Sequence, residues 1–247
     1  NMGGTAIGTG INADERYLRR IIPNLSKVTG LELVQASDLI DATQNLDGLV
    51  AVSGAVKTCA VNLSKMSNDL RLMSSGPRCG FSEINLPPRQ NGSSIMPGKI
   101  NPTVPEMVIQ IAHQVIGNDV AVSVALYDGE LDLNVWDSTF YKCLFESFTL
   151  VEEETKIFCR DCVEGIKANR ERCMKEARGS IALSTIVATC FGYPTGVKVA
   201  HYCEQHGCDV HQAVQEMGLM TKEEADWLVD PILMTEPEKI ADAAAEF

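Results

Sequence analysis

The chain has 247 residues, of which 45% are hydrophobic, and its formal net charge is −12 at pH 7. This length can hold one large domain or two smaller ones with a substantial core. The acidic balance argues against a nucleic-acid or membrane partner, because nucleic acids and anionic membranes select basic surfaces. With no leader segment at its start and no apolar run near the roughly 20 residues that span a bilayer, the sequence predicts a cytoplasmic protein.

The first residues are rich in glycine. Residues 8–13, Gly-Thr-Gly-Ile-Asn-Ala, match a relaxed dinucleotide-binding pattern, and Glu32 lies about where an acidic ribose ligand would fall. That pattern requires a preceding strand, and residues 5–7 are too short and glycine-flanked to form one. A glycine turn before a helix is therefore the favoured interpretation. No element precedes these glycines, and the abrupt start at Asn1 indicates a truncated chain.

A long amphipathic helix is predicted over residues 47–74. Two sets of apolar residues recur at intervals of seven and interleave, as in a bundle seam. They are Leu49, Val56, Leu63 and Leu70, and Val52, Cys59, Met66 and Met73. Such a helix is about 40 Å long at 1.5 Å per residue, which suits an extended bundle.

Residues 75–77, Ser-Gly-Pro, end that helix, and the prolines and glycines that follow predict a loop up to Pro102. A loop of this size within a compact protein is usually functional or disordered. A second helix follows Pro102, with an apolar stripe that continues to Val122. A third runs from about Trp136 to Cys162 through Phe140, Leu144, Phe148 and Val151.

These helices predict an all-α fold, with a long-helix bundle portion over residues 1–167 that contains a catalytic loop at 88–102. Beyond residue 167, glycines divide the sequence into short helical pieces, which predict a small helical domain over 168–247.

The nine cysteines are odd in number and mostly lie among apolar helix-forming residues, which favours reduced thiols. Cys159 and Cys162 form a lone CxxC on a helix and are predicted to be two buried thiols. The residues His201, Cys203, His206, Cys208 and His211 are soft-metal ligand types, but they straddle a helix end at Gly207, so we expect their side chains to diverge. No metal site and no cofactor is predicted.

The loop motif at residues 92–102 reads Gly-Ser-Ser-Ile-Met-Pro-Gly-Lys-Ile-Asn-Pro. From composition alone, a surface turn that caps the next helix explains it. A flexible loop that exposes hydroxyls beside one ammonium, directly before a helix start, also forms a local anion site in an acidic protein. Glu106 lies one turn into that helix and could orient a base.

The same motif resembles the signature of the fumarase/aspartase superfamily. Further segments are similar to that family, at residues 3–10, 68–71, 75–78, 83–87 and 133–135. Argininosuccinate and adenylosuccinate lyases resemble the loop less well at Ile95 and Gly98. Within the family, Pro105 and residues 117–119 and 233–235 favour the aspartase branch, with class II fumarase as the alternative.

The resemblance implies a lyase that eliminates ammonia from L-aspartate to give fumarate through an aci-carboxylate intermediate. It implies Ser93 as the general base and Ser94 as a ligand of the carboxylate that becomes the enediolate. Lys99 and Asn101 would bind the other carboxylate of this small dicarboxylate substrate. Glu106 would orient a histidine from another subunit of a homotetramer.

The family builds each site from three segments donated by three subunits, and two of those segments should lie before Asn1. None of His113, His201, His206 or His211 lies in a matching motif. We therefore expect this chain alone to be inactive. A noncatalytic fragment, or a structural relative such as the lens crystallins of this superfamily, is the second hypothesis.

Overall fold

The computed structural model describes residues 1–244, and it is 64% helical with two short strands, which confirms the all-α class. Its α-helices are α1 (Glu15–Thr29), α2 (Asp41–Gln44), α3 (Asp47–Met73), α4 (Thr103–Tyr127), α5 (Asp137–Asp161), α6 (Arg170–Arg178), α7 (Ser184–Phe191), α8 (Tyr193–His206), α9 (Val210–Glu216), α10 (Lys222–Leu228) and α11 (Pro237–Ala244). The strands are β1 (Ile84–Asn85) and β2 (Lys167–Ala168), and short 3-10 turns lie at Val163–Gly165, Ile181–Leu183 and Leu233–Thr235.

The chain divides into two compact units. The bundle unit comprises Asn1–Met73 and Leu86–Ile166. The carboxyl-terminal unit comprises Ser74–Asn85 and the described residues from Lys167 onward. The second unit thus includes residues 74–85, which the sequence pattern places in the loop of the first domain. The reason is that β1 pairs with β2 in antiparallel register, Ile84 with Ala168.

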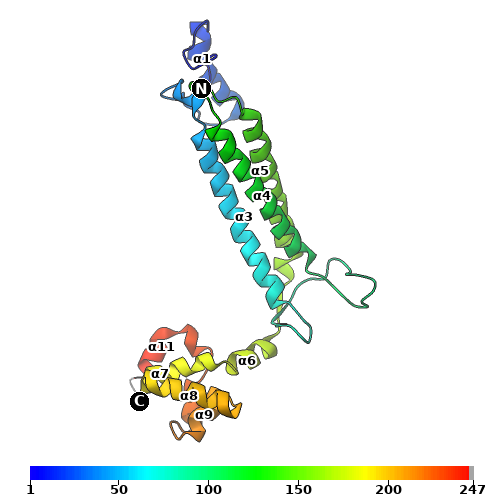
Figure 1. Cartoon of the computed structure of the whole chain (residues 1–247), viewed down its shortest axis with the longest axis vertical. Helices are drawn as coiled ribbons and strands as arrows, with labels where there is room; N and C mark the ends of the chain where they lie inside the picture. Colours follow the sequence, from blue (N-terminus) through cyan, green and yellow to red (C-terminus); the bar gives the residue numbers. More distant parts are fainter. Residues whose placement is uncertain (245–247) are drawn as a thin grey trace. The chain divides into compact units, whose positions relative to one another are not determined.

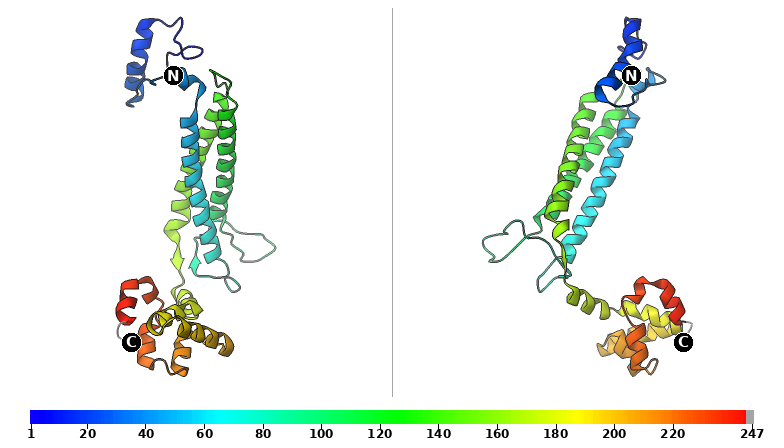
Figure 2. Two further views of the ribbon diagram at one scale, coloured as in Figure 1. Left: turned by 60° about the vertical axis from the view of Figure 1, so that its left-hand side comes forward. Right: turned by 180° about the vertical axis from the view of Figure 1, so that it is seen from behind.

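Three long helices, α3, α4 and α5, lie side by side in the bundle unit, as Figures 1 and 2 show. The middle helix in sequence, α4, packs along both of the others. Their seam is divided into three successive apolar clusters, centred on Phe140 and Val122, on Ala60 and Ala112, and on Val108 and Phe158. The end of α3 at Met73 and the start of α4 at Thr103 agree with the signals of the nearby glycine and prolines, and α5 ends one residue before the predicted Cys162.

The glycine-rich start contains no strand, because residues 5–12 form turns that lead to α1. Asp14 caps that helix by accepting a hydrogen bond from the Arg16 N–H at 2.8 Å. The close approach of Ile40, whose Cα would lie 2.4 Å from a Cβ at position 8, requires glycine there. A dinucleotide fingerprint is therefore excluded at this segment.

The helix α4 is long and apolar enough to cross a membrane by length and composition alone. It is instead the shared helix of the bundle, and it carries a polar layer. The buried Asp119 accepts hydrogen bonds from the Ser53 hydroxyl at 2.8 Å and the Lys57 ammonium at 2.5 Å, both on α3. Its neighbour Asn118 donates to Glu146 and Ser147 on α5, at 2.9 and 3.1 Å. Such a layer fixes the register of the three helices, since a slip would leave each group unpaired.

Replacing Asp119 with alanine is expected to lower the free energy of unfolding by about 2 kcal/mol, because two donors lose a charged acceptor. Urea unfolding followed by helical circular dichroism measures this change. The control is Asp69→Ala, which removes an exposed ion pair with Lys65 on α3 and should cost less than about 0.5 kcal/mol. Equal losses in the two variants would mean that the polar layer contributes no more than a surface pair.

Two side chains on α5, predicted from the sequence pattern to be buried, are exposed. Phe148 is 43% exposed and Cys159 is exposed, although Cys162 is buried. The inward stripe of α5 steps by four and three residues through Phe140, Leu144, Ser147, Val151, Glu154 and Phe158. Phe148 and Cys159 each follow a stripe position by one residue, so each is turned about 100° away from the seam.

The carboxyl-terminal unit has its own core between α7 and α8, with α9, α10 and α11 packed around it. The two helices cross closely at Gly196, where a Cβ would lie 2.7 Å from that of Ala188. A capping box at Thr221 and Glu224 starts α10. The pieces of about ten residues that the glycines predict are thus confirmed as helices.

Candidate functional site

The signature loop, residues 88–102, belongs to the bundle unit and stands away from its long helices in Figures 1 and 2. A bridge between Asn91 and Ile100 closes its neck, where the Gly92 N–H donates to the Lys99 carbonyl at 2.7 Å. Glycine is required at position 92, since a Cβ there would lie 2.7 Å from that carbonyl oxygen. The neck therefore makes residues 92–99 one closed hairpin.

Turns order the tip of this hairpin. The Met96 N–H donates to the Ser93 carbonyl at 3.2 Å, and the Lys99 N–H donates to the Met96 carbonyl at 3.2 Å. The Ser93 hydroxyl accepts from the Ile95 N–H at 3.3 Å. A donor aimed at this oxygen favours its negative form, which is the form that the predicted role of Ser93 as a base requires.

The five residues predicted for the site fall on this hairpin and on the helix behind it. Ser93, Ser94 and Lys99 are exposed on the hairpin, and Asn101 and Glu106 are half-buried at the start of α4. Within residues 1–244 these five side chains make no hydrogen bond to one another. The Lys99 ammonium forms no ion pair in the described chain, so its charge is available to an anion.

Glu106 lies within reach of a cation of α3. Its Oε1 is 3.4 Å from the Nη2 of Arg71, and both side chains are about a third exposed, at 35% and 39%. The acid predicted to orient a histidine thus contacts an arginine of the neighbouring helix.

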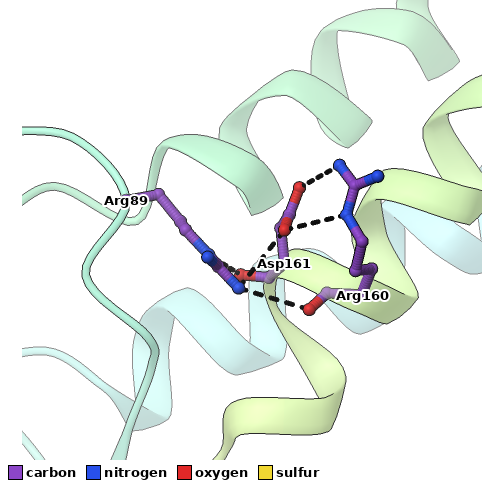
Figure 3. Close-up of polar contacts among 3 residues, drawn as sticks. All are labelled: Arg89, Arg160 and Asp161. Carbon is purple, nitrogen blue, oxygen red and sulfur yellow. Dashed lines mark hydrogen bonds and ion pairs between the residues drawn. The ribbon is translucent and has the colours of Figure 1, made fainter.

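A second arginine, Arg89, attaches the loop to the carboxyl end of α5 (Figure 3). It lies on the entry leg, residues 88–91, which leads into the hairpin. Arg89 donates from Nε to the Asp161 carbonyl at 2.9 Å and from Nη2 to the Arg160 carbonyl at 3.3 Å. Its Nη2 is also 3.2 Å from the Asp161 carboxylate. Hydrogen bonding by Arg160 holds the pKa of Asp161 below its usual range, with the charge of Arg89 adding to the effect.

The histidines and cysteines of residues 201–211 do not gather at one point. The His201 ring lies 3.6 Å from Glu204, the His206 ring stacks on Tyr202, and His211 Nε2 is 2.7 Å from Asp226. In the part of the chain described, no three His, Cys, Asp or Glu side chains are arranged to hold a metal ion. The three histidines thus diverge as expected, but Cys203 and Cys208 do not, because their thiols are hydrogen-bonded to each other across the helix end at Gly207.

Two polar features of the bundle unit were not found from the sequence, although a signal for both exists. Asp119 and Glu154 each occupy a position on an otherwise apolar stripe, and this marks a buried polar group. The Arg89 attachment has no such signal, because its partners lie 71 and 72 residues further along the chain.

Comparisons with known proteins agree with the loop motif. A lyase family model matches residues 1–117, and a model of the fumarase C carboxyl terminus matches residues 183–236. Proteins named aspartate ammonia-lyase are similar over most of the chain. That of a Bacillus species is 43% identical over 96% of this chain, and that of Escherichia coli is 44% identical over 92%.

Solved structures share the fold. A class II fumarase from Schistosoma mansoni superposes with a TM-score of 0.90 at 32% identity over 95% of this chain and 52% of its own. A fumarate lyase:delta crystallin from Brucella melitensis gives 0.87 at 40% identity over 94% of this chain and 50% of its own. The chain spans about half the length of its curated relatives, 51% and 47% for the two named above. It belongs to the fumarase/aspartase superfamily of lyases.

Proposed function

We propose that the whole protein is a cytoplasmic, homotetrameric aspartate ammonia-lyase that converts L-aspartate to fumarate and ammonia. The observation that carries the proposal is the closed hairpin of residues 92–99, which presents two serines and an ammonium without an ion pair in the described residues, directly before a helix start. The 43–46% identity to relatives of that name supports the choice of substrate. The free cysteines fit a reducing compartment.

In this proposal Ser93, as an alkoxide, removes a proton from the carbon next to one carboxylate of the substrate. The electron pair moves into that carboxylate and gives the aci-carboxylate, which then expels ammonia from the neighbouring carbon. Doubling the charge on a carboxylate requires preorganised donors and cations, commonly the largest catalytic contribution. Ser94 and the loop N–H groups supply the donors.

Lys99 and Asn101 bind the second carboxylate. Lys99 suits this role because its charge is not neutralised within the described chain, and Asn101 lies beside the N-terminus of α4, which favours anions. Glu106 orients a histidine donated by another subunit, with Arg71 as its neighbour on α3.

Assembly into a tetramer is supported by the apolar surface that the bundle unit leaves uncovered. An open groove of about 750 Å³ between α3 and α5 is lined by Ala55, Val56, Cys59, Phe148 and Val151, among others. On the same helix, Tyr141 and Phe145 are 53% and 64% exposed. Apolar patches of this kind mark protein interfaces, and a bundle shared between subunits would cover them.

The test uses the whole protein, with both halves of the family length present. Absorbance of fumarate should grow with L-aspartate and not with L-malate. Growth with L-malate alone would assign the protein to class II fumarase, the second candidate, which the fold match to the Schistosoma mansoni enzyme favours.

The 247 residues on their own, which span about half the length of the relatives, are expected to show no turnover of either substrate. If the whole protein is also folded, helical and inactive with both, it is a noncatalytic relative.

A further inference from the structure

Arg89 makes the densest polar contact at the base of the signature loop. Its guanidinium reaches two main-chain carbonyls and one carboxylate at the end of α5, between 2.9 and 3.3 Å. These three contacts, drawn in Figure 3, lie in one small region where α5 ends at Asp161. The last carbonyls of a helix have no partner within the helix and carry partial negative charge, so a cation there is favoured.

The Arg89 side chain is 45% exposed, while the chain segments beneath it lie close together. A void of only about 10 Å³ remains among the loop base, the start of α4 and the end of α5, including Leu86, Pro87, Pro102 and Cys162. The planar fork of arginine suits two parallel acceptors, which a lysine cannot match. The entry leg of the loop is thus held at one point by two charged hydrogen bonds and an ion pair of a half-exposed side chain.

The two legs of the hairpin are held differently. Arg89 precedes the neck at Asn91 by two residues and Ser93 by four, on the entry leg. The exit leg continues through Asn101 into α4, whose own hydrogen bonds fix it. A change at Arg89 therefore acts first on the leg that carries Ser93.

We infer that Arg89 is a positioning residue for Ser93, locking the entry leg of the signature loop onto the carboxyl end of α5. The inference rests on the proposed role of Ser93 as base. Asp161 assists by its carboxylate, while the two carbonyl contacts make the main attachment.

The first experiment measures the attachment in the chain itself. Rapid hydrogen exchange of the peptide that covers residues 90–101 is compared among wild type, Arg89→Met, Arg89→Lys and Arg160→Met. Loss of the attachment should speed exchange of the loop amides about fivefold in Arg89→Met and less in Arg89→Lys. Arg160→Met is the matched control, because Arg160 pairs with the same Asp161 carboxylate but donates nothing to the loop.

The variant Asp161→Asn tests how much the carboxylate contributes to the attachment apart from the two main-chain carbonyls. It keeps both main-chain acceptors of Arg89, so its exchange rate should lie between those of wild type and Arg89→Met. Unchanged exchange in Arg89→Met, or an equal rise in Arg160→Met, would overturn the inference.

The second experiment uses the whole protein and L-aspartate, or L-malate if that is the substrate. Arg89→Met should lower kcat about tenfold or more with KM within about twofold, because a displaced base acts only on the transition state while the carboxylate ligands of the exit leg stay in place. Arg89→Lys should recover part of the loss, and Arg160→Met should match wild type. A rise in KM at constant kcat would contradict the positioning role. An inactive wild-type protein would reject the proposed function, and the exchange comparison would still decide the attachment.

Discussion

Replacing Glu154 with glutamine is expected to raise the free energy of unfolding of the bundle unit at high pH. The change in this free energy, variant minus wild type, should be about 3 kcal/mol more favourable at pH 9 than at pH 4. Glu154 lies on α5 with 1% of its surface exposed, and neither carboxylate oxygen has a hydrogen-bond partner among residues 1–244. Burial raises the pKa of Glu154 to about 7, from 4.5. A shift of this size corresponds to about 3 kcal/mol, at about 1.4 kcal/mol per pKa unit.

The sign follows from the protons bound in each state. Between pH 4.5 and about 7 the folded chain keeps a proton on Glu154 that the unfolded chain has lost, so stability falls as the pH rises. Below pH 4.5 both states are protonated and the penalty vanishes. Glutamine has nearly the same shape and never ionises, so the variant lacks this fall.

The measurement is urea unfolding at a series of pH values, followed by Trp136 fluorescence in a Trp227→Phe background. The chain has two tryptophans, and Trp136 lies in the bundle unit. The control is Glu153→Gln, one residue before and exposed, where the pH profile should follow that of wild type. If the free energy of unfolding of Glu154→Gln and of wild type changed with pH in the same way, Glu154 would be ionised or solvated in the folded chain.

Ser93→Ala in the whole protein is expected to lower kcat for fumarate formation about a thousandfold, within the range for loss of a general base. Helical circular dichroism should not change, since Ser93 is exposed and, within the described residues, its hydroxyl accepts one hydrogen bond, from the Ile95 N–H. KM should change little, because the substrate carboxylates are assigned to Ser94, Lys99 and Asn101. Ser94→Ala should have a smaller effect on kcat, since the loop N–H groups remain as donors.

Much of the fold follows from local patterns. The seven-residue spacing from Leu49 to Leu70 and the breaks at Gly76 and Pro102 predict α3 and the loop within one or two residues. Such patterns succeed because each records a single element, whose apolar face and end signals lie within its own sequence. The resemblance to the superfamily rests on short contiguous motifs for the same reason, above all on residues 92–102.

Contacts between distant segments could not be predicted in this way. The pairing of Ile84 with Ala168 involves strands of two residues, too short to show an alternating pattern. The attachment of Arg89 to the end of α5 depends on how the loop returns to the bundle, which no local spacing encodes. The site residues were predicted by type and position, but their grouping on a closed hairpin depends on the hydrogen bond from Gly92 to Lys99.

The most direct measurement of the proposed function is the rate of fumarate formation from L-aspartate by the whole protein, with Ser93→Ala and Ser37→Ala assayed side by side. Ser37 is an exposed serine of the same unit, outside the signature loop. If the loop supplies the base, the rate of Ser93→Ala falls about a thousandfold and that of Ser37→Ala stays at the wild-type level. Equal rates for the two variants would contradict the assignment of the base to this loop.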